Sequence, residues 1–323
     1  MTRLNVVIAA EEAAGAQTVK TVARSDHRIV AVLTGGEQTS GMPSPVFGAT
    51  SRLDLPRWPA EWVRDPALAD RLRDEQVDLL MNVHSLYIIA APVLAAPRIG
   101  AFNLHPGPLP EYAGLNTPSW AVYHGRKRYG VTLHWMVPKI DAGPIAYRAD
   151  FDISDEDTAL TVATNCVRHG LPLLDELLEA AERGRDAIPR IQQDLKRRRY
   201  YGRQVPNQGW LDWSRPAREI ADFVRACDYG PFPAPWPWPR TRLGDVEVRV
   251  AKVALTEEPS SAVPGCVEQV ERGSPLVATG TTLIEVKRVE ADGVLVDAGT
   301  LLRLGSQLAM RGAVQAGTEP KSE

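Results

Sequence analysis

Two polar residues, Asn103 and His105, stand two positions apart at the end of an apolar run that begins at Gly100. If this run is a strand, the spacing points both side chains to one face, at the strand end where α/β sheets bind their ligands. Asp141 follows in a turn-forming stretch after a further strand-like run that ends at Met136. An amide and an imidazole would then share one pocket, and the carboxylate follows 36 positions beyond His105.

The elements that must position these residues follow from the hydrophobic pattern. Short apolar runs alternate with amphipathic segments from Leu4 to about Gly184, which predicts an α/β domain with a mainly parallel sheet. We expect strands at 4–9, 28–34, 77–83, 100–104, 130–136 and 146–153, and helices at 14–24, 66–75, 88–94, 117–124 and 155–184. Residues 133–135 fall inside one of these strands, and we therefore interpret His134 as a packed strand residue.

The second half of the chain has a different pattern. A cationic stretch, 196–203, lies between Pro189 and Pro206 and is interpreted as a solvated linker rather than as an RNA-binding strip. A short helix at 216–227 and several short alternating runs after Arg240 predict a small open β-barrel. The expected organisation is a catalytic domain at 1–188, a linker at 189–206, a barrel domain at 207–312 and a disordered tail at 313–323.

Composition excludes several classes of protein. The 323 residues are 44% hydrophobic and 24% charged, and no apolar run approaches the roughly 20 residues that would span a bilayer. A net charge of −3 lacks the basic footprint of a protein that grips long nucleic acids. Three distant cysteines form neither a disulfide framework nor a zinc site, so we expect a protein of the reducing cytoplasm with no metal. The first strand lacks a Gly-x-Gly-x-x-Gly sequence after it, which disfavours a dinucleotide-dependent dehydrogenase.

Four motifs, in order, resemble those of the folate-dependent formyltransferases. They are Asn103-Leu104-His105, the Leu-Pro-x-x-x-Gly stretch from Leu109 to Gly114, Gly130-Val131-Thr132, and Asp141-Ala142-Gly143. The second half is similar, more weakly, to the carboxyl-terminal domains of methionyl-tRNA formyltransferase and of the amino-arabinose formyltransferase, through 201–203, 211–213 and 264–267. The resemblance implies a Rossmann-like catalytic domain followed by an OB-like barrel.

The resemblance also implies an activity, which is transfer of a formyl group from 10-formyl-tetrahydrofolate to a primary amine. Asn103 and His105 would then offer N–H groups to the oxyanion, and Asp141 would orient the imidazole or relay the proton of the amine through water. By similarity, the folate is expected against two stretches of the chain. Its expected contacts are Met81, His84, Leu86, Ile88, Val137, Ile140 and Gly143.

Departures from the tRNA-formylating pattern bear on the acceptor. The arginine that those enzymes carry after the Leu-Pro loop is missing from 113–118, and residues 35–41 contain no Lys or Arg. A small-molecule amine is therefore favoured over tRNA: an amino sugar nucleotide, an amino acid or a carrier-bound aminoacyl group. Tyr112, Asn116 and Trp120 are the expected acceptor contacts, although a core role for Trp120 competes with this interpretation.

Three alternatives stay open at this stage: methionyl-tRNA formylation, a non-catalytic folate-binding protein, and hydrolysis of the donor to formate. Whether the barrel forms a homodimer also stays open.

Overall fold

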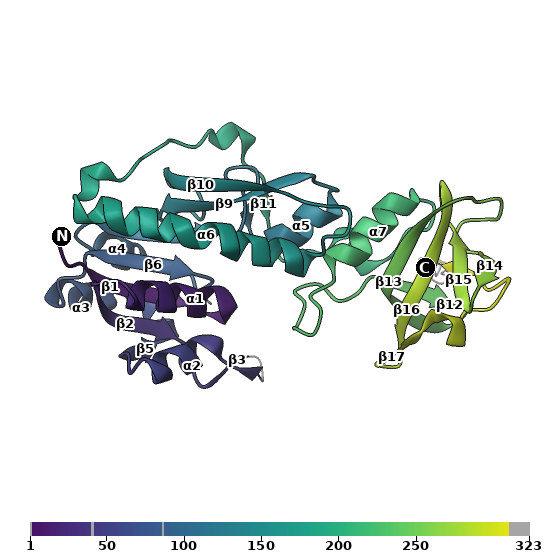
Figure 1. Ribbon diagram of the computed structural model, residues 1–323, viewed down its shortest axis with the longest axis horizontal. Helices are drawn as coiled ribbons and strands as arrows, with labels where there is room; N and C mark the ends of the chain where they lie inside the picture. Colours follow the sequence, from purple (N-terminus) through teal and green to yellow (C-terminus); the bar gives the residue numbers. More distant parts are fainter. Residues whose placement is uncertain (1, 40–41, 86, 310–323) are drawn as a thin grey trace, which may run out of the picture. The chain divides into compact units, whose positions relative to one another are not determined.

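The computed structural model describes residues 2–39, 42–85 and 87–309, and the chain divides into two compact units (Figure 1). The first unit contains Met1–Thr117, Arg128–Ile153 and Ala163–Gly202, and the second contains Pro118–Lys127, Ser154–Val162 and Arg203–Glu323. The expected linker is thus divided, since residues 189–202 group with the first unit. The expected disordered tail at 313–323 lies outside the described residues.

The first unit is built on a seven-stranded sheet with the strand order β10-β9-β7-β6-β1-β2-β5. Five neighbouring strands are parallel, and β9 and β10 complete the sheet in antiparallel pairings. Their bounds are β1 Asn5–Ala10, β2 Arg28–Thr34, β5 Arg57–Pro59, β6 Leu79–Val83, β7 Gly100–His105, β9 Arg128–Trp135 and β10 Ile145–Asp152. The prediction of a mainly parallel sheet is confirmed.

Helices cover this sheet on both faces. They are α1 Glu12–Ala23, α2 Pro45–Arg52, α3 Leu68–Asp74, α4 Ala91–Ala95 and α6 Ala159–Glu182, and α5 Thr117–Tyr123 follows β8. Helix α4 begins at Ala91, three residues later than expected, because Pro92 fits the first turn of a helix. Four two-residue strands of the described part of this unit carried no periodic signal and were not expected: β3 Gln38–Thr39, β4 Met42–Pro43, β8 Ala113–Gly114 and β11 Tyr200–Tyr201.

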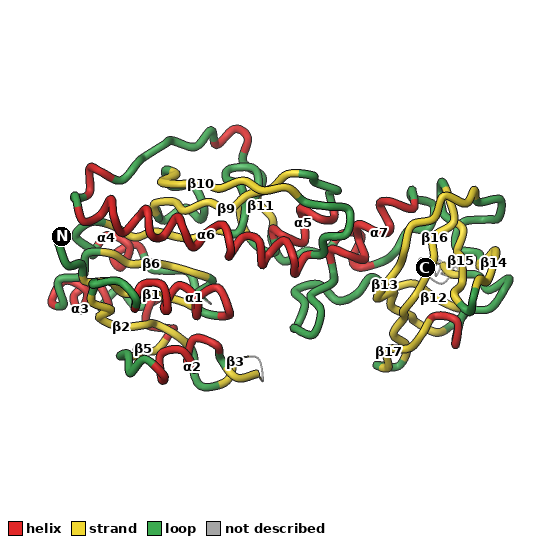
Figure 2. The backbone as a smooth tube through the Cα atoms, in the orientation of Figure 1, coloured by secondary structure: helices red, strands yellow, loops and turns green. Residues whose placement is uncertain are grey.

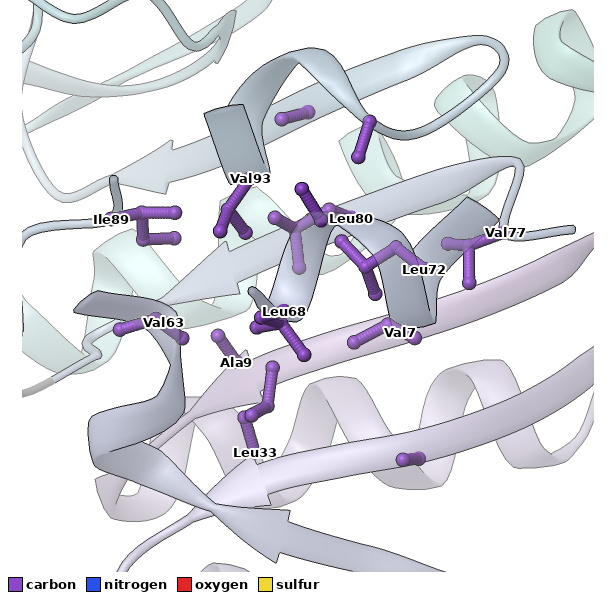
Figure 3. Close-up of a cluster of buried hydrophobic side chains, with 14 of the residues drawn as sticks. Val7, Ala9, Leu33, Val63, Leu68, Leu72, Val77, Leu80, Ile89 and Val93 are labelled. Carbon is purple, nitrogen blue, oxygen red and sulfur yellow. The ribbon is translucent and has the colours of Figure 1, made fainter. Parts of the chain in front are cut away.

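One face of the sheet carries the large apolar cluster shown in Figure 3. Side chains of β1, β2 and β6, among them Val7, Leu33 and Leu80, pack there against α3 and α4. On the other face, α6 passes close to Leu104 of β7 and Val131 of β9 at Gly170. Because side chains alternate along a strand, Asn103 and His105 point away from α6, to the face that carries the cluster.

The second unit contains α7 Ala217–Ala226 and a curled antiparallel sheet with the order β14-β15-β16-β13-β12-β18, with β17 paired to β16 (Figure 2). The strands are β12 Arg240–Leu243, β13 Val246–Pro259, β14 Val267–Glu271, β15 Ser274–Ala278, β16 Thr282–Ala291, β17 Val294–Asp297 and β18 Leu308–Ala309. The expectation of a small open barrel is confirmed.

Short 3-10 helices complete the description: η1 Ala60–Arg64, η2 Arg185–Ala187, η3 Leu195–Arg197, η4 Pro206–Gly209 and η5 Ala298–Thr300. In the part of the chain that the structure describes, no helix has the length and apolar character required to cross a bilayer.

Candidate functional site

Two adjacent strands bring polar side chains to the same edge of the sheet. In the antiparallel pairing of β7 with β9, Asn103 lies opposite His134 and His105 lies opposite Thr132. Thr132 Oγ1 donates to the carbonyl of Gly107 at 2.8 Å and accepts from the N–H of Leu109 at 3.2 Å. The threonine therefore fixes the loop that follows His105.

Asp141 lies between the two histidines. Its Oδ2 atom is 3.7 Å from His105 Nδ1, and its Oδ1 atom is 3.5 Å from His134 Nε2. The N–H of Gly114 donates to Asp141 Oδ2 at 2.8 Å. Asp141 is only 8% exposed and has a left-handed backbone, with φ of 52°. Non-glycine residues rarely adopt this left-handed backbone conformation, and those that do are concentrated at active sites.

The hydrogen bonds of His105 define where its proton resides. Its Nε2 atom lies 2.5 Å from the carbonyl oxygen of Tyr112, and because a carbonyl only accepts, Nε2 carries the hydrogen. Burial lowers the pKa of His105 below its usual range, and the neighbouring Asp141 opposes this without reversing it. The imidazole is therefore neutral near pH 7, with a lone pair at Nδ1.

The carboxyl group of Asp141 stays ionised in this buried place. Burial alone would raise its pKa, but the nearby His105 and His134, which attract the carboxylate when they are protonated, and the N–H of Gly114 hold the pKa well below its usual range. A buried carboxylate with these partners can balance positive charge that develops on an imidazole.

His134 belongs to this cluster. Its Nδ1 donates to the carbonyl of Trp135 at 2.8 Å, which leaves Nε2 to accept from Asn103 Nδ2 at 3.1 Å. Asn103 Oδ1 in turn accepts from Asn82 Nδ2 at 2.7 Å. Our interpretation of His134 as a packed strand residue missed these contacts. The two-residue spacing of Thr132 and His134 was the available signal, since it places both on one face of β9.

The residues expected to bind the folate are spread over two stretches. Met81 is buried within β6, and His84 has a left-handed backbone and pairs with Glu12 at 2.8 Å. Ile88 is 71% exposed, and Val137 and Ile140 are each more than one-third exposed. Gly143 packs against the carbonyl of Trp135. Leu86 lies outside the described residues.

Exposed apolar side chains suit a flat aromatic ring, and buried acceptors suit its N–H groups. Beside the site, Asn82 Oδ1 and Gln193 Oε1 are two buried acceptors with no hydrogen-bond partner. These features fit a folate-like molecule.

The three expected acceptor contacts have different surroundings. The ring of Tyr112 is buried and stacks on Tyr201 with centroids 5.4 Å apart, and its backbone carbonyl accepts from His105 Nε2. Asn116 is partly exposed, with φ of 56°. Trp120 belongs to the second unit, where its ring lies 4.8 Å from that of Trp236.

In the described residues, no group of three or more His, Cys, Asp or Glu side chains has the arrangement of a metal site.

Comparison with protein families gives two matches. The family described as formyl transferase matches residues 3–172, and the family described as formyl transferase, C-terminal domain, matches residues 204–302. The first match includes Asn103, His105, His134 and Asp141.

Solved structures with a similar fold have low sequence identity. An N-formyltransferase from Helicobacter canadensis, solved with folinic acid and dTDP-3-aminofucose, is 17% identical with a TM-score of 0.66, over 88% of this chain and 99% of that chain. WlaRD, a sugar 3N-formyl transferase solved with dTDP and 5-N-formyl-THF, is 17% identical with a TM-score of 0.67, over 91% and 100%. HypX from Aquifex aeolicus, solved with tetrahydrofolic acid, is 15% identical with a TM-score of 0.64, over 92% of this chain but only 46% of HypX.

Proposed function

Because the chain belongs to the formyl transferase family, we propose that it moves a formyl group from 10-formyl-tetrahydrofolate to the primary amine of a small molecule. The observation that carries the proposal is the cluster that the buried His105 and Asp141 form with the half-buried Asn103 within the region that matches the family. The folate molecules in the three similar structures support the choice of donor.

His105 is the proton acceptor in this proposal. An amine must lose a proton as it attacks the formyl carbon, and the lone pair of Nδ1 is available to take it because Nε2–H is engaged with Tyr112. Our expectation from the sequence was that His105 donates an N–H to the oxyanion. The neutral imidazole has no second N–H for this, so we assign the oxyanion to Asn103.

Asn103 suits that role because its Nδ2 atom has two hydrogens and donates one of them to His134. The other is assigned to the oxyanion of the tetrahedral intermediate. Asn82 holds the amide in this orientation through its bond to Oδ1. Loss of one such oxyanion donor typically costs about 100- to 1,000-fold in turnover.

Asp141 balances the charge that appears when His105 takes the proton. The carboxylate lies 3.7 Å from Nδ1, close enough to favour the imidazolium without removing its proton. When the bond between the formyl carbon and the folate nitrogen breaks, the same proton passes from Nδ1 to that nitrogen. The imidazole then returns to its neutral form.

A small amine is a better acceptor for this site than tRNA. Two cations of the stretch that we had considered for RNA contacts are engaged within the first unit: Arg197 pairs with Glu111, and Arg198 donates to the carbonyl of Ile140 at 3.0 Å. The proposed acceptors remain amino sugar nucleotides, amino acids and carrier-bound aminoacyl groups. The amino sugar nucleotide in the Helicobacter canadensis structure supports the first of these.

We also propose that the protein works in a reducing compartment, the cytoplasm. The support is chemical: Cys166, Cys227 and Cys266 are all free thiols, and two of them are buried.

Donor turnover tests the function. The protein is mixed with 10-formyl-tetrahydrofolate and with separate pools of nucleotide-linked amino sugars, amino acids and charged initiator tRNA, and tetrahydrofolate release is followed together with the mass of the acceptor. We expect one small-amine pool to gain the mass of a formyl group, and His105→Ala to abolish the gain.

Other outcomes contradict the proposal in distinct ways. Formylation of tRNA alone would identify a tRNA formyltransferase, and tetrahydrofolate release without an acceptor would identify a hydrolase. Donor binding without turnover in any pool would identify a binding protein.

A further inference from the structure

Residues 193–201 contact the loop that carries Asp141. Gln193 Nε2 donates to the carbonyl of Asp141 at 3.1 Å and to the carbonyl of Gly143 at 2.6 Å. Arg198 donates to the carbonyl of Ile140. Three backbone carbonyls of this loop are thus held by side chains that follow it by about fifty residues, on the chain that returns from the end of α6 toward β11 (Figures 1 and 2).

The same segment also holds the 110–115 loop, which supplies hydrogen-bond partners to His105 and Asp141. Strand β11 pairs in parallel with β8, and backbone hydrogen bonds join Arg199 to Pro110 and Ala113, and Tyr201 to Leu115. Between these anchors lie the Tyr112 carbonyl, which accepts from His105, and the Gly114 N–H, which donates to Asp141.

Gln193 is suited to this task by its amide. Both acceptors are carbonyl oxygens, so the NH₂ end must face them and the amide orientation is chemically determined. The two N–H groups of Gln193 bind carbonyls on either side of the left-handed turn at Asp141, and they restrict the rotation of its peptide groups. The direction of the Cα–Cβ bond of Asp141 is thereby fixed. A carboxylate that must keep contact with Gly114, His105 and His134 at once depends on that direction.

We propose that Gln193 is a positioning residue for the carboxylate of Asp141, and that residues 193–201 are a structural part of the active site. This inference rests on the proposed function only in its kinetic consequence, because the placement of the carboxylate can be measured without turnover.

The kinetic experiment compares Gln193→Met with Gln192→Met. Methionine keeps most of the volume of glutamine and removes both donors, and Gln192 is an exposed neighbour on the same segment. We expect kcat to fall about 10- to 100-fold in the first variant, as is typical when a supporting partner of a catalytic group is lost, and to stay within about twofold in the second. Equal kcat in both variants and the wild type would overturn the inference.

A double-mutant cycle shows whether Gln193 acts through Asp141. If it does, Gln193→Met should cost less than about threefold when added to Asp141→Asn, because the carboxylate that it positions is already gone. A full 10- to 100-fold loss in that background as well would mean that Gln193 acts elsewhere.

A titration that needs no turnover separates this inference from the proposed function. With ¹³C-labelled aspartate carboxyl groups, the signal that disappears in Asp141→Asn reports Asp141. We expect the pKa of Asp141 to rise toward its usual range in Gln193→Met, because the contacts that lower it are loosened, and to stay unchanged in Gln192→Met. An unchanged pKa in Gln193→Met would overturn the inference, whereas a wild type that turns over no formyl donor would overturn only the proposed function.

Discussion

At the scale of single residues, the site is a carboxylate held between two imidazoles, with an amide beside them. The spacing of Asn103 and His105 was enough to predict that they share a face, because alternation is a property of one strand. The same spacing places Thr132 and His134 on one face of β9, but it does not bring His134 to Asn103. Its place opposite Asn103 depends on which strand pairs with β7 and in which register, and the hydrophobic pattern of a single strand contains neither.

The proton-acceptor role of His105 predicts a pH dependence. Because burial lowers its pKa, we expect kcat/KM to be retained at pH 6.5, the ordinary pKa of the group, and to fall only at lower pH as the imidazole becomes protonated. Asp141→Asn removes the charge that opposes this shift. We expect its acid limb to move to still lower pH, and kcat at pH 7.5 to fall by about 100-fold or more. Rate profiles from pH 5 to 9 of the wild type and of Asp141→Asn measure both effects. An acid limb that moves to higher pH in the variant would contradict the charge interaction assigned to Asp141 and His105.

At the scale of elements, the shortest strands hold the site together. Strands β8 and β11 have two residues each, so they show no periodicity from which a pairing could be predicted. Because no periodicity marked β11, the arginine-rich sequence around it was interpreted as a solvated linker. Its backbone bonds to the 110–115 loop are invisible to composition, which reports side chains only.

Gly114 in β8 tests the importance of this pairing. It has φ of +97°, and a Cβ there would lie 2.1 Å from the carbonyl oxygen of Tyr201. Gly184 has φ of +109° with nothing within 4 Å of the same position, so Gly184→Ala measures backbone strain alone. We expect the free energy of unfolding to fall by about 1–2 kcal/mol in Gly184→Ala, and by more in Gly114→Ala. Denaturant titration gives both values.

Activity should separate the two glycine variants further. Gly114→Ala displaces the N–H that binds Asp141, so we expect kcat to fall about 10-fold or more, whereas Gly184→Ala should turn over like the wild type. Equal stability and activity of the two variants would show that the β8–β11 pairing tolerates the clash.

Cys166 in α6 and Cys227 after α7 report the integrity of the packed elements around them. Both are buried, and burial raises the pKa of each thiol, so neither forms the reactive thiolate readily. We expect iodoacetamide to modify the partly exposed Cys266 in the native protein, and the other two only after denaturation. Mass spectrometry of peptides identifies the modified residue; native labelling of Cys166 would show that α6 opens.

At the scale of the whole molecule, the chain divides into two compact units whose segments interleave along the sequence. Segments 118–127 and 154–162 group with the carboxyl-terminal unit, although they lie within the catalytic half. Boundaries drawn at changes of composition assume that each unit is one continuous stretch of chain. The residues of these two segments follow ordinary helix and turn patterns, so their sequence does not mark the change of unit.

The net charge and the engaged arginines predict how the whole enzyme responds to salt. A small amine releases few counterions, so we expect its KM to change less than about threefold between roughly 50 and 200 mM salt, whereas a tRNA substrate held by six to ten phosphate contacts would weaken by about 10³- to 10⁵-fold. Initial rates at both salt concentrations decide between them. A steep loss with the small amine would contradict the proposed acceptor class.

The position of Gln193 in the chain affects when the active site can form during synthesis. On the ribosome, Asp141 emerges 52 residues before the side chain that binds its carbonyl, a delay of roughly 3 to 10 s at ordinary elongation rates. The strands of the first sheet have all been synthesised by then. A nascent chain can therefore complete its sheet before Gln193 can bind the Asp141 loop. If Gln193 positions Asp141 as proposed, the active site is finished only when residues 193–201 have left the exit tunnel.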